Sequence, residues 1–223
     1  MGRLARQPSA DTPASDTQRL GTPTKGTAAT TAGLDFTRHM RLLCEDIVRR
    51  LPELHHINLD FVAIRVCQTR SRALYGIHAS MTPLRFRDGA RTTVRRGRHW
   101  TVRPVRDGAG REMLYLLSFY LPRFCDQPCA EKLATIVHEL WHIGPRFDGD
   151  LRRLAGRCYA HGHSEAAYHR QMRDLAQRWL ALNPAADLYA FLSHDFRGLR
   201  AQYGAVFGTT IPTPKLILLS SVA

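Results

Sequence analysis

The sequence predicts an α+β fold, and three observations support this class. Apolar residues recur at helical spacing from Phe36 to Leu51, just ahead of Pro52. Segments rich in β-branched and aromatic residues follow between 61 and 121. A second apolar stripe with helical spacing begins after residue 128, and further helix-like stretches come after it. We therefore expect a helix, a small antiparallel sheet with a basic hairpin, a second helix and closing C-terminal helices, in that order.

The first 33 residues differ in composition from the rest. They are rich in Thr, Ala, Ser, Pro and Gly and contain very few large apolar side chains. Such a segment cannot bury enough apolar surface to offset its conformational entropy. We expect residues 1–33 to form a disordered tail and residues 34–223 to form a single domain of ordinary size.

Individual elements can be placed along the predicted domain. The first helix is defined by a regular apolar set: Phe36, Met40, Leu43, Ile47 and Leu51. Strands are expected at 61–66, 74–80, 91–105 and 112–121, with turns at Asp88-Gly89 and Asp107-Gly108. Later helices are expected near 165–182 and 186–202, and a strand-like tail near 215–219.

The chemistry of the chain is concentrated in the run His138-Glu139-Leu140-Trp141-His142. The flanking apolar residues Leu133, Ile136, Val137, Leu140 and Trp141 have core-facing helical spacing, so the histidines lie on the flank of the buried stripe. Asp126 and Pro128 are typical of a helix start, and Gly144-Pro145 ends the helix after the second histidine.

Histidines four apart on one helical face can hold a single metal ion, and an adjacent glutamate can reach a water bound to it. Zinc held in this way makes water nucleophilic near neutral pH. The sequence therefore predicts a Zn²⁺ site with His138 and His142 as ligands and Glu139 as the catalytic base. In a zinc peptidase we also expect an edge strand that pairs with extended substrate, either the strand ending near Leu121 or the basic hairpin.

A catalytic zinc site normally has three protein ligands, so one more must come from downstream. His161, which precedes a glycine in the loop before the next helix, is the first candidate, followed by Glu165 and then His163. Asp148 occupies the last slot of the pattern H-E-x-x-H-x-x-G-x-x-H, but Pro145 stands where that pattern has glycine. Asp148 is therefore the weakest candidate.

These residues carry a family resemblance. The run His138 to His142, the pair His161-Gly162, and Tyr168 and Met172 behind it resemble the SprT/Spartan-type zinc metallopeptidases. The chain is more similar still to a set of bacterial and phage metallopeptidases of unknown substrate, through Phe147 to Arg153 and Gly156 to His161.

The resemblance covers most of residues 35–220, although only 138–161 is specific, and Leu154 departs from it where some relatives place a histidine. It implies a zincin-like core, His161 as the third zinc ligand, and DNA-bound protein as substrate.

Positive charge is concentrated in the middle of the chain. Of the net charge of +13, residues 65–111 contribute +10, from twelve arginines against Asp88 and Asp107. Such clustering is typical of contact with DNA or another polyanion, and an interleaved aromatic ring can stack on bases. The candidate contact residues are Arg91, Arg95, Arg96, Arg98, Trp100 and Arg103. A solvated hairpin whose charges protect a sheet edge is the alternative.

Other features limit the classes of function. The N-terminus has no apolar segment typical of a secretory signal, and no apolar run approaches the ~18 residues of a membrane span. Five unpatterned cysteines favour a reducing cytoplasm. We expect a zinc-dependent metallopeptidase acting on protein or peptide, with nucleic-acid-associated protein as a candidate substrate. The alternative is a nucleic-acid-binding or accessory protein with a structural or degenerate zinc site, for example one closed by Cys158.

Overall fold

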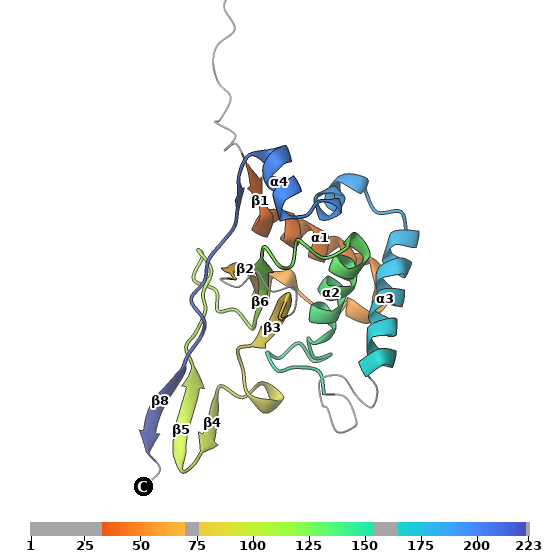
Figure 1. The fold of residues 1–223 in the computed structure, drawn as a ribbon. Coiled ribbons are helices and arrows are strands. Elements are labelled where there is room, and N and C mark those ends of the chain that lie inside the picture. Colours follow the sequence, from red (N-terminus) through yellow and green to blue (C-terminus); the bar gives the residue numbers. More distant parts are fainter. Residues whose placement is uncertain (1–32, 70–75, 154–164, 222–223) are drawn as a thin grey trace, which may run out of the picture. The chain divides into compact units, whose positions relative to one another are not determined.

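The computed structural model describes residues 33–69, 76–153 and 165–221, and the chain from Ala32 to Ala223 forms one compact unit (Figure 1). Helices and small sheets are both present, which confirms the α+β class. The tail predicted at 1–33 lies, apart from Gly33, outside the described residues.

The elements follow one another in a simple order. The α-helices are α1 Phe36–Arg50, α2 Cys129–Trp141, α3 Glu165–Ala181 and α4 Phe196–Tyr203. The strands are β1 Leu34–Asp35, β2 Val62–Gln68, β3 Ala79–Pro83, β4 Thr92–Arg95, β5 Arg98–Val102, β6 Tyr115–Leu121, β7 Val206–Phe207 and β8 Leu216–Ser221. Short 3-10 helices are η1 Pro52–Leu54, η2 Leu59–Phe61, η3 Arg87–Gly89, η4 Ala186–Leu188 and η5 Ala190–Ser193.

The central sheet has the strand order β2-β6-β3 and is mixed. β6 runs parallel to β2 and antiparallel to β3, so the prediction of a purely antiparallel sheet is wrong. The physical reason lies in β6, because residues 115–119 are all buried and a strand covered on both faces occupies the centre of a sheet. The strand ending at Leu121 is therefore not an edge strand, and β3 lies at the edge instead.

Helix α1 forms as its apolar spacing predicts. Asp35 caps its first turn by accepting a hydrogen bond from the backbone N–H of Arg38 at 3.0 Å. The five predicted core residues are all buried: Phe36, Met40, Leu43, Ile47 and Leu51. Phe36 packs edge-on against the rings of Phe119 and Phe124, which ties α1 to the central sheet.

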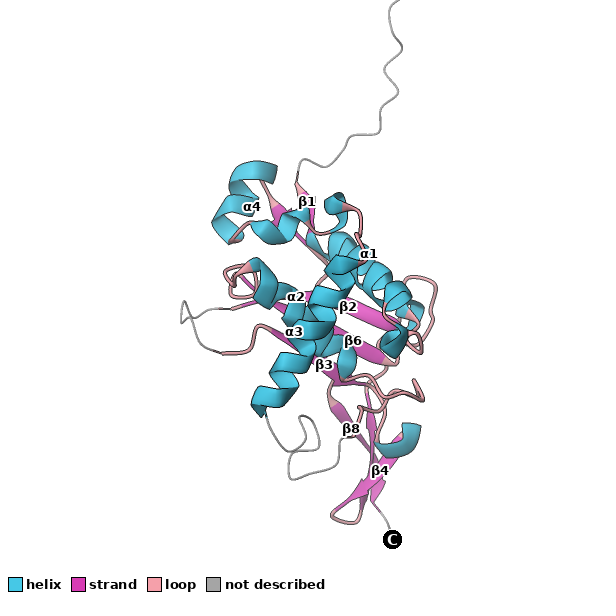
Figure 2. Cartoon of the chain, turned by 90° about the vertical axis from the view of Figure 1, so that its right-hand side faces the viewer, coloured by secondary structure: helices cyan, strands magenta, loops and turns pink. Residues whose placement is uncertain are grey.

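The two faces of the central sheet are covered differently. Helices α2 and α3 lie side by side in front of one face (Figure 2). The C-terminal segment covers part of the other face. Buried Arg65 fixes it there by donating to Ser118 Oγ at 2.8 Å and to the carbonyl oxygen of Ile211 at 2.6 Å. One of the twelve clustered arginines thus has a structural role inside the fold.

A second sheet has the order β4-β5-β8 and is antiparallel. Its hairpin turn is Arg96-Gly97, where both residues have positive φ, as in type I′ turns. Asp88-Gly89, predicted as a hairpin turn, instead lies in η3 and joins β3 to the second sheet. The predicted single strand 91–105 is therefore two strands, and the C-terminal tail pairs with the hairpin as β8.

The closing segment differs partly from expectation. The helix predicted near 165–182 is confirmed as α3, but the stretch 186–202 is broken into η4, η5 and the short α4. Asp195 explains the break, because its side chain accepts from the backbone N–H of Gly198 and starts a new helix there. Within the described residues, no helix is long and apolar enough to cross a membrane.

Substitution of Asp46 tests the packing of α1 on α3. Buried Asp46 accepts hydrogen bonds from Trp179 Nε1 at 3.0 Å and Arg50 Nε at 2.7 Å. Asp46→Ala leaves the buried indole N–H unsatisfied and should lower the free energy of unfolding by about 1–3 kcal/mol in urea denaturation. Asp46→Asn keeps an acceptor oxygen and should cost less; an equal loss in both variants would contradict the role given to the Trp179 bond.

Candidate metal centre

Helix α2 carries the histidine pair on the flank of its buried face. Its buried face consists of Leu133, Ile136, Val137 and Leu140, while His138 and His142 are half-buried on the flank, as predicted. The helix starts one residue after Pro128, which makes no side-chain cap. Asp126, predicted as the cap, instead accepts from the backbone N–H of Phe196 at 3.1 Å, so the prediction of its role is wrong. The Asp126 side chain thus bonds to the start of α4 instead of capping α2.

The two histidine rings converge. Nε2 of His138 and Nε2 of His142 lie 2.9 Å apart, with ring centroids separated by 4.7 Å. Two nitrogens on one tetrahedral zinc ion, each at about 2.0–2.1 Å, would lie roughly 3.3 Å apart. The pair is therefore oriented toward a common point and is close to the spacing that a shared metal ion requires.

Position 142 is set by the end of the helix. His142 is the C-cap residue of α2, and the backbone N–H of Arg152 donates to its carbonyl oxygen at 2.7 Å. A Cβ on Gly144 would lie 3.1 Å from the carbonyl oxygen of Asp150, so the chain returns very close to the helix end. The Gly144-Pro145 stop thus allows the following loop to pack beside the histidine.

Glu139 is the most buried polar group of the motif, with 7% of its surface exposed. Burial raises the pKa of its carboxyl group to about 7, and a hydrogen bond from the backbone of Met81 acts in the opposite direction. A cation held by the neighbouring histidines would lower that pKa further. Glu139 is thus a desolvated carboxylate next to β3. Because it is shielded from water, nearby charges and hydrogen bonds change its pKa strongly.

The Met81 bond follows from the register of β3. Tyr120 N–H donates to the carbonyl oxygen of His78, and Leu84 N–H donates to that of Leu114. Since hydrogen-bonded pairs alternate in antiparallel strands, the even-numbered residues of β3 bond to β6. The backbone groups of Ala79, Met81 and Pro83 therefore point to the outer edge of the sheet, on the side of Glu139.

Helix α3 brings two more rings to the site. The ring of buried Tyr168 meets the ring of His138 edge-on, with ring centroids 5.1 Å apart. The ring of His169 stacks on the same His138 ring, with centroids 5.8 Å apart. Burial is the main cause that raises the pKa of the Tyr168 hydroxyl, with Glu139 adding to the effect. The sequence analysis named Tyr168 among the residues of the family resemblance and missed His169, although the position of His169 next to Tyr168 in an expected helix is a usable signal.

The loop after the motif contributes Arg152. Its Nε donates to the carbonyl oxygen of Trp141 at 2.8 Å, and its guanidinium lies 4.3 Å from the centre of the Trp141 ring. Burial lowers its pKa. Sequence reasoning did not single out this residue, because nothing in a run of two arginines shows which one folds back onto α2.

The candidates for the third zinc ligand fall partly inside and partly outside the described residues. Within the described ranges, no third His, Cys, Asp or Glu joins the histidine pair in a group suited to a metal. Asp148 is accounted for elsewhere, since its carboxylate pairs with Arg146 and accepts from the N–H of Asp150. His161 and His163, with Cys158 as the fourth ligand of the alternative closed site, lie outside the described residues, as does the side chain of Glu165.

The cluster of arginines predicted to form one basic patch is divided by the fold. Arg65 is buried, while Arg85, Arg91 and Arg106 all pair with the carboxylate of Glu112. Arg111 pairs with Asp107 and Asp60, and Arg70 and Arg72 lie outside the described residues. The arginines of residues 65–111 therefore do not form one uninterrupted surface, because Arg65 is buried and the carboxylates of Glu112 and Asp60, outside that sequence window, lie among the others.

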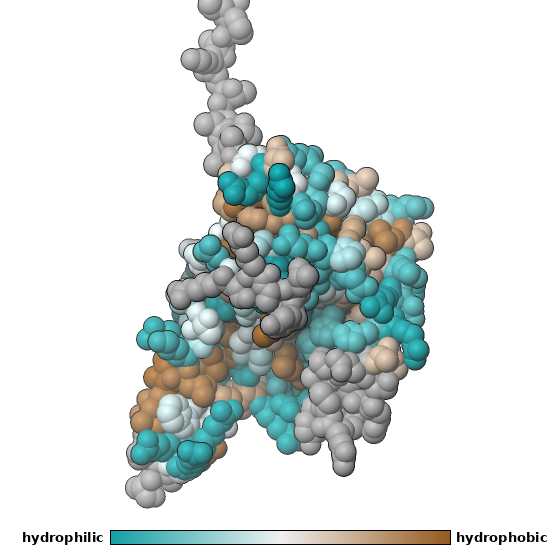
Figure 3. Space-filling view, viewed as in Figure 1, coloured by the Kyte–Doolittle hydropathy of each residue, from teal (hydrophilic) through white to brown (hydrophobic). Residues whose placement is uncertain are grey.

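The second sheet presents the remaining candidates. Thr93 and Arg95 pair with Trp100 and Arg98, so their side chains share one face of the hairpin, whereas Arg96 lies in the turn. Arg103 is exposed just after β5. Exposed apolar side chains accompany them at Val94, Leu216, Leu218 and Leu219, and Figure 3 shows hydrophobic surface interleaved with hydrophilic surface over this sheet. The face is mixed rather than purely basic.

Comparisons with known proteins returned nothing that bears on these assignments. No protein-family model, curated protein or solved structure matches the chain. The resemblance to SprT/Spartan-type peptidases therefore stays a prediction from the motif residues.

Metal analysis of histidine variants tests the centre. The purified protein should hold about one zinc ion per chain, and His138→Ala or His142→Ala should lose it because two ligands cannot replace three. His161→Ala should lose it as well, whereas His99→Ala on β5 should keep it. Elemental analysis after dialysis measures the occupancy; full zinc in His161→Ala would move the assignment to Glu165 or His163.

Proposed function

We propose that the protein is a zinc-dependent peptidase with a zincin-like core. The observation that carries the proposal is the convergence of His138 and His142, 2.9 Å apart at Nε2, beside buried Glu139. Imidazole nitrogens are donors that suit zinc, and the half-buried pair fits that ion. His161 is the proposed third ligand.

Zinc bound here would act as a Lewis acid and lower the pKa of water. The role of Glu139 follows from its surroundings. Its carboxyl group is desolvated, and Glu139 directly follows His138 on α2; we expect it to accept a proton from the attacking water and return it to the leaving amine. Its buried position and the backbone bond from Met81 keep the carboxylate in one orientation.

Substrate binding is the role proposed for the edge of β3. The outward backbone groups of Ala79 and the outward carbonyl oxygen of Met81 are available for pairing with an extended chain, in the manner of strand addition, while the Met81 N–H is used by Glu139. An edge strand beside a two-histidine helix supports the zincin-like comparison. It also replaces the strand ending near Leu121, which lies in the centre of the sheet.

Glu139→Gln tests the proposed chemistry. The amide cannot take up the proton, so hydrolysis of an unfolded protein substrate should fall by roughly 10²–10⁴-fold while zinc remains bound. The matched control is Glu131→Gln on the same helix, where Glu131 is exposed to solvent and pairs with Arg173. Undiminished proteolysis by Glu139→Gln would exclude Glu139 as the base.

A second candidate function is contact with nucleic acid through the second sheet. It is favoured by one observation: Arg95, Arg98 and Trp100 share a face, which combines cations with a ring that can stack on bases. Substrates bound to DNA would then be brought to the metal centre by their nucleic acid.

Binding of a fluorescent single-stranded oligonucleotide tests this candidate. Affinity should fall steeply with salt, and Trp100→Ala should weaken it by about 1–3 kcal/mol if a base stacks there. Val94→Ala, on the opposite face of β4, is the control. Equal affinity in Trp100→Ala and Val94→Ala would argue against recognition by this face.

A further inference from the structure

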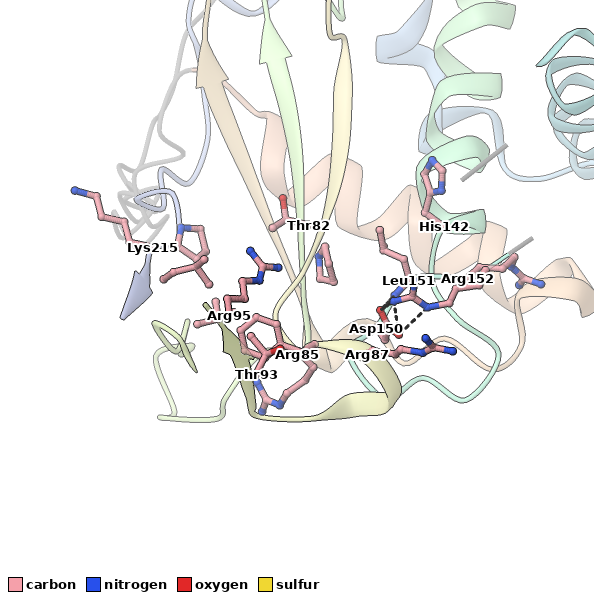
Figure 4. Close-up of a pocket in the computed structure, with 16 residues that line it drawn as sticks. Thr82, Arg85, Arg87, Thr93, Arg95, His142, Asp150, Leu151, Arg152 and Lys215 are labelled. Atoms are coloured by element: carbon pink, nitrogen blue, oxygen red, sulfur yellow. Dashed lines mark hydrogen bonds and ion pairs between the residues drawn. The ribbon is translucent and has the colours of Figure 1, made fainter. Parts of the chain in front are cut away.

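A cleft of about 540 Å³ opens beside His142 and extends to the second sheet. The end of β3, with Thr82 and Pro83, forms one part of its wall, and Arg152 adjoins the histidine. Figure 4 shows His142 and Arg152 at one end of the cleft, and Arg95 and Lys215 at the opposite end. The cleft therefore connects the proposed metal centre with a surface formed by β4, β5 and the segment before β8.

The lining of this cleft is strongly cationic. Its charged residues are five arginines and one lysine against a single carboxylate, that of Asp150. Three of the cations have a carboxylate partner: Arg85 pairs with Glu112 at 2.8 Å, Arg153 with Asp150 at 3.0 Å and Arg87 with Asp88 at 3.5 Å. Arg95, Arg152 and Lys215 form no ion pair with any carboxylate of the described residues.

The guanidinium groups of Arg152 and Arg95 each lie against an aromatic ring. Arg152 lies over Trp141 at 4.3 Å, and Arg95 lies over Phe86 at 6.0 Å. The Nε of Arg152 is used by the carbonyl oxygen of Trp141, which leaves its two terminal nitrogens for a bidentate contact. A half-buried, preorganised guanidinium of this kind is suited to bind a carboxylate.

The path of a bound chain favours polypeptide as the occupant. Strand addition along β3 can use the outward groups of Ala79 and the outward carbonyl oxygen of Met81, but Pro83 lacks an N–H and cannot continue the ladder. Thr82 and Pro83 themselves line the cleft. A substrate paired with β3 would thus leave the sheet edge at Pro83 and continue into the cationic cleft as the same chain.

We propose that this cleft selects polypeptides that carry Asp or Glu side chains on one side of the scissile bond, with Arg152 as the specificity-determining residue nearest the metal centre. The proposal rests on the proposed peptidase function. Arg95 and Lys215 would bind further acidic side chains of the same segment.

The test compares two fluorescein-labelled peptides that differ only in carrying Glu or Gln at the same positions. Binding is measured by anisotropy to zinc-loaded Glu139→Gln protein, so that affinity is read without cleavage. The Glu peptide should bind at least ~10-fold more tightly, and Arg152→Gln or Lys215→Gln introduced into this protein should remove most of the difference. Arg152→Lys should retain part of it, and Arg197→Gln on α4 is the control that should change nothing.

Three outcomes would overturn the proposal. The first is equal affinity for the two peptides, and the second is an unchanged preference in both Arg152→Gln and Lys215→Gln. The third is tighter binding of a single-stranded oligonucleotide that displaces the Glu peptide and depends on Arg152 in the same way, since the cleft would then be a nucleic-acid site. Exposed Lys215 keeps the test informative if Arg152→Gln fails to fold.

Failure of the proposed function would look different. Wild-type protein that cleaves neither peptide, together with an Arg152-dependent preference for the Glu peptide, would contradict hydrolysis but not acidic binding. Cleavage of both peptides with equal KM and kcat would contradict only the preference. In the expected case, the Glu peptide has the lower KM, and Arg152→Gln raises that KM with little change in kcat.

Discussion

Packing of α2 between the central sheet and α3 is the constraint on which the orientation of the histidine pair depends. Leu133, Ile136, Val137 and Leu140 bury one side of the helix, and Tyr168 of α3 lies against the ring of His138. Rotation of α2 would expose those apolar side chains, at a cost of about 1.5–3 kcal/mol for each fully exposed one. The convergence of His138 and His142 is therefore a consequence of core packing rather than of the histidines themselves.

The same packing sets the electrostatics beside the histidines. Glu139 and Arg152 are both drawn out of water, which raises the pKa of the carboxyl group and lowers that of the guanidinium. The backbone bond from Met81 and the Trp141 contacts offset part of the desolvation cost. The carboxyl group of Glu139 and the guanidinium of Arg152 thus each have a backbone partner, Met81 and Trp141 respectively, that restricts their orientation.

Local patterns predicted the elements better than their pairing. Two predicted elements match the structure: the stripe from Phe36 to Leu51 corresponds to α1, and the run Tyr115 to Leu121 corresponds to β6. Both were predictable because the pattern of buried residues within an element depends on residues close together in the sequence. The parallel pairing of β2 with β6 and the capture of β8 by the basic hairpin join residues far apart in sequence. No local signal specifies such pairings, and Arg96-Gly97 is an unusual type I′ turn that composition does not indicate.

The sequence by itself determined that His138 and His142 share one face of a helix, since a spacing of four residues with 3.6 residues per turn requires it, and that Glu139 directly follows the first histidine. The tertiary structure alone decided what surrounds them. It brought Met81, Tyr168, His169 and Arg152 to the motif, and it gathered Arg85, Arg91 and Arg106 around the one carboxylate of Glu112. These contacts depend on how distant segments bury their apolar surface together, which is a property of the whole packed chain and not of any window of it.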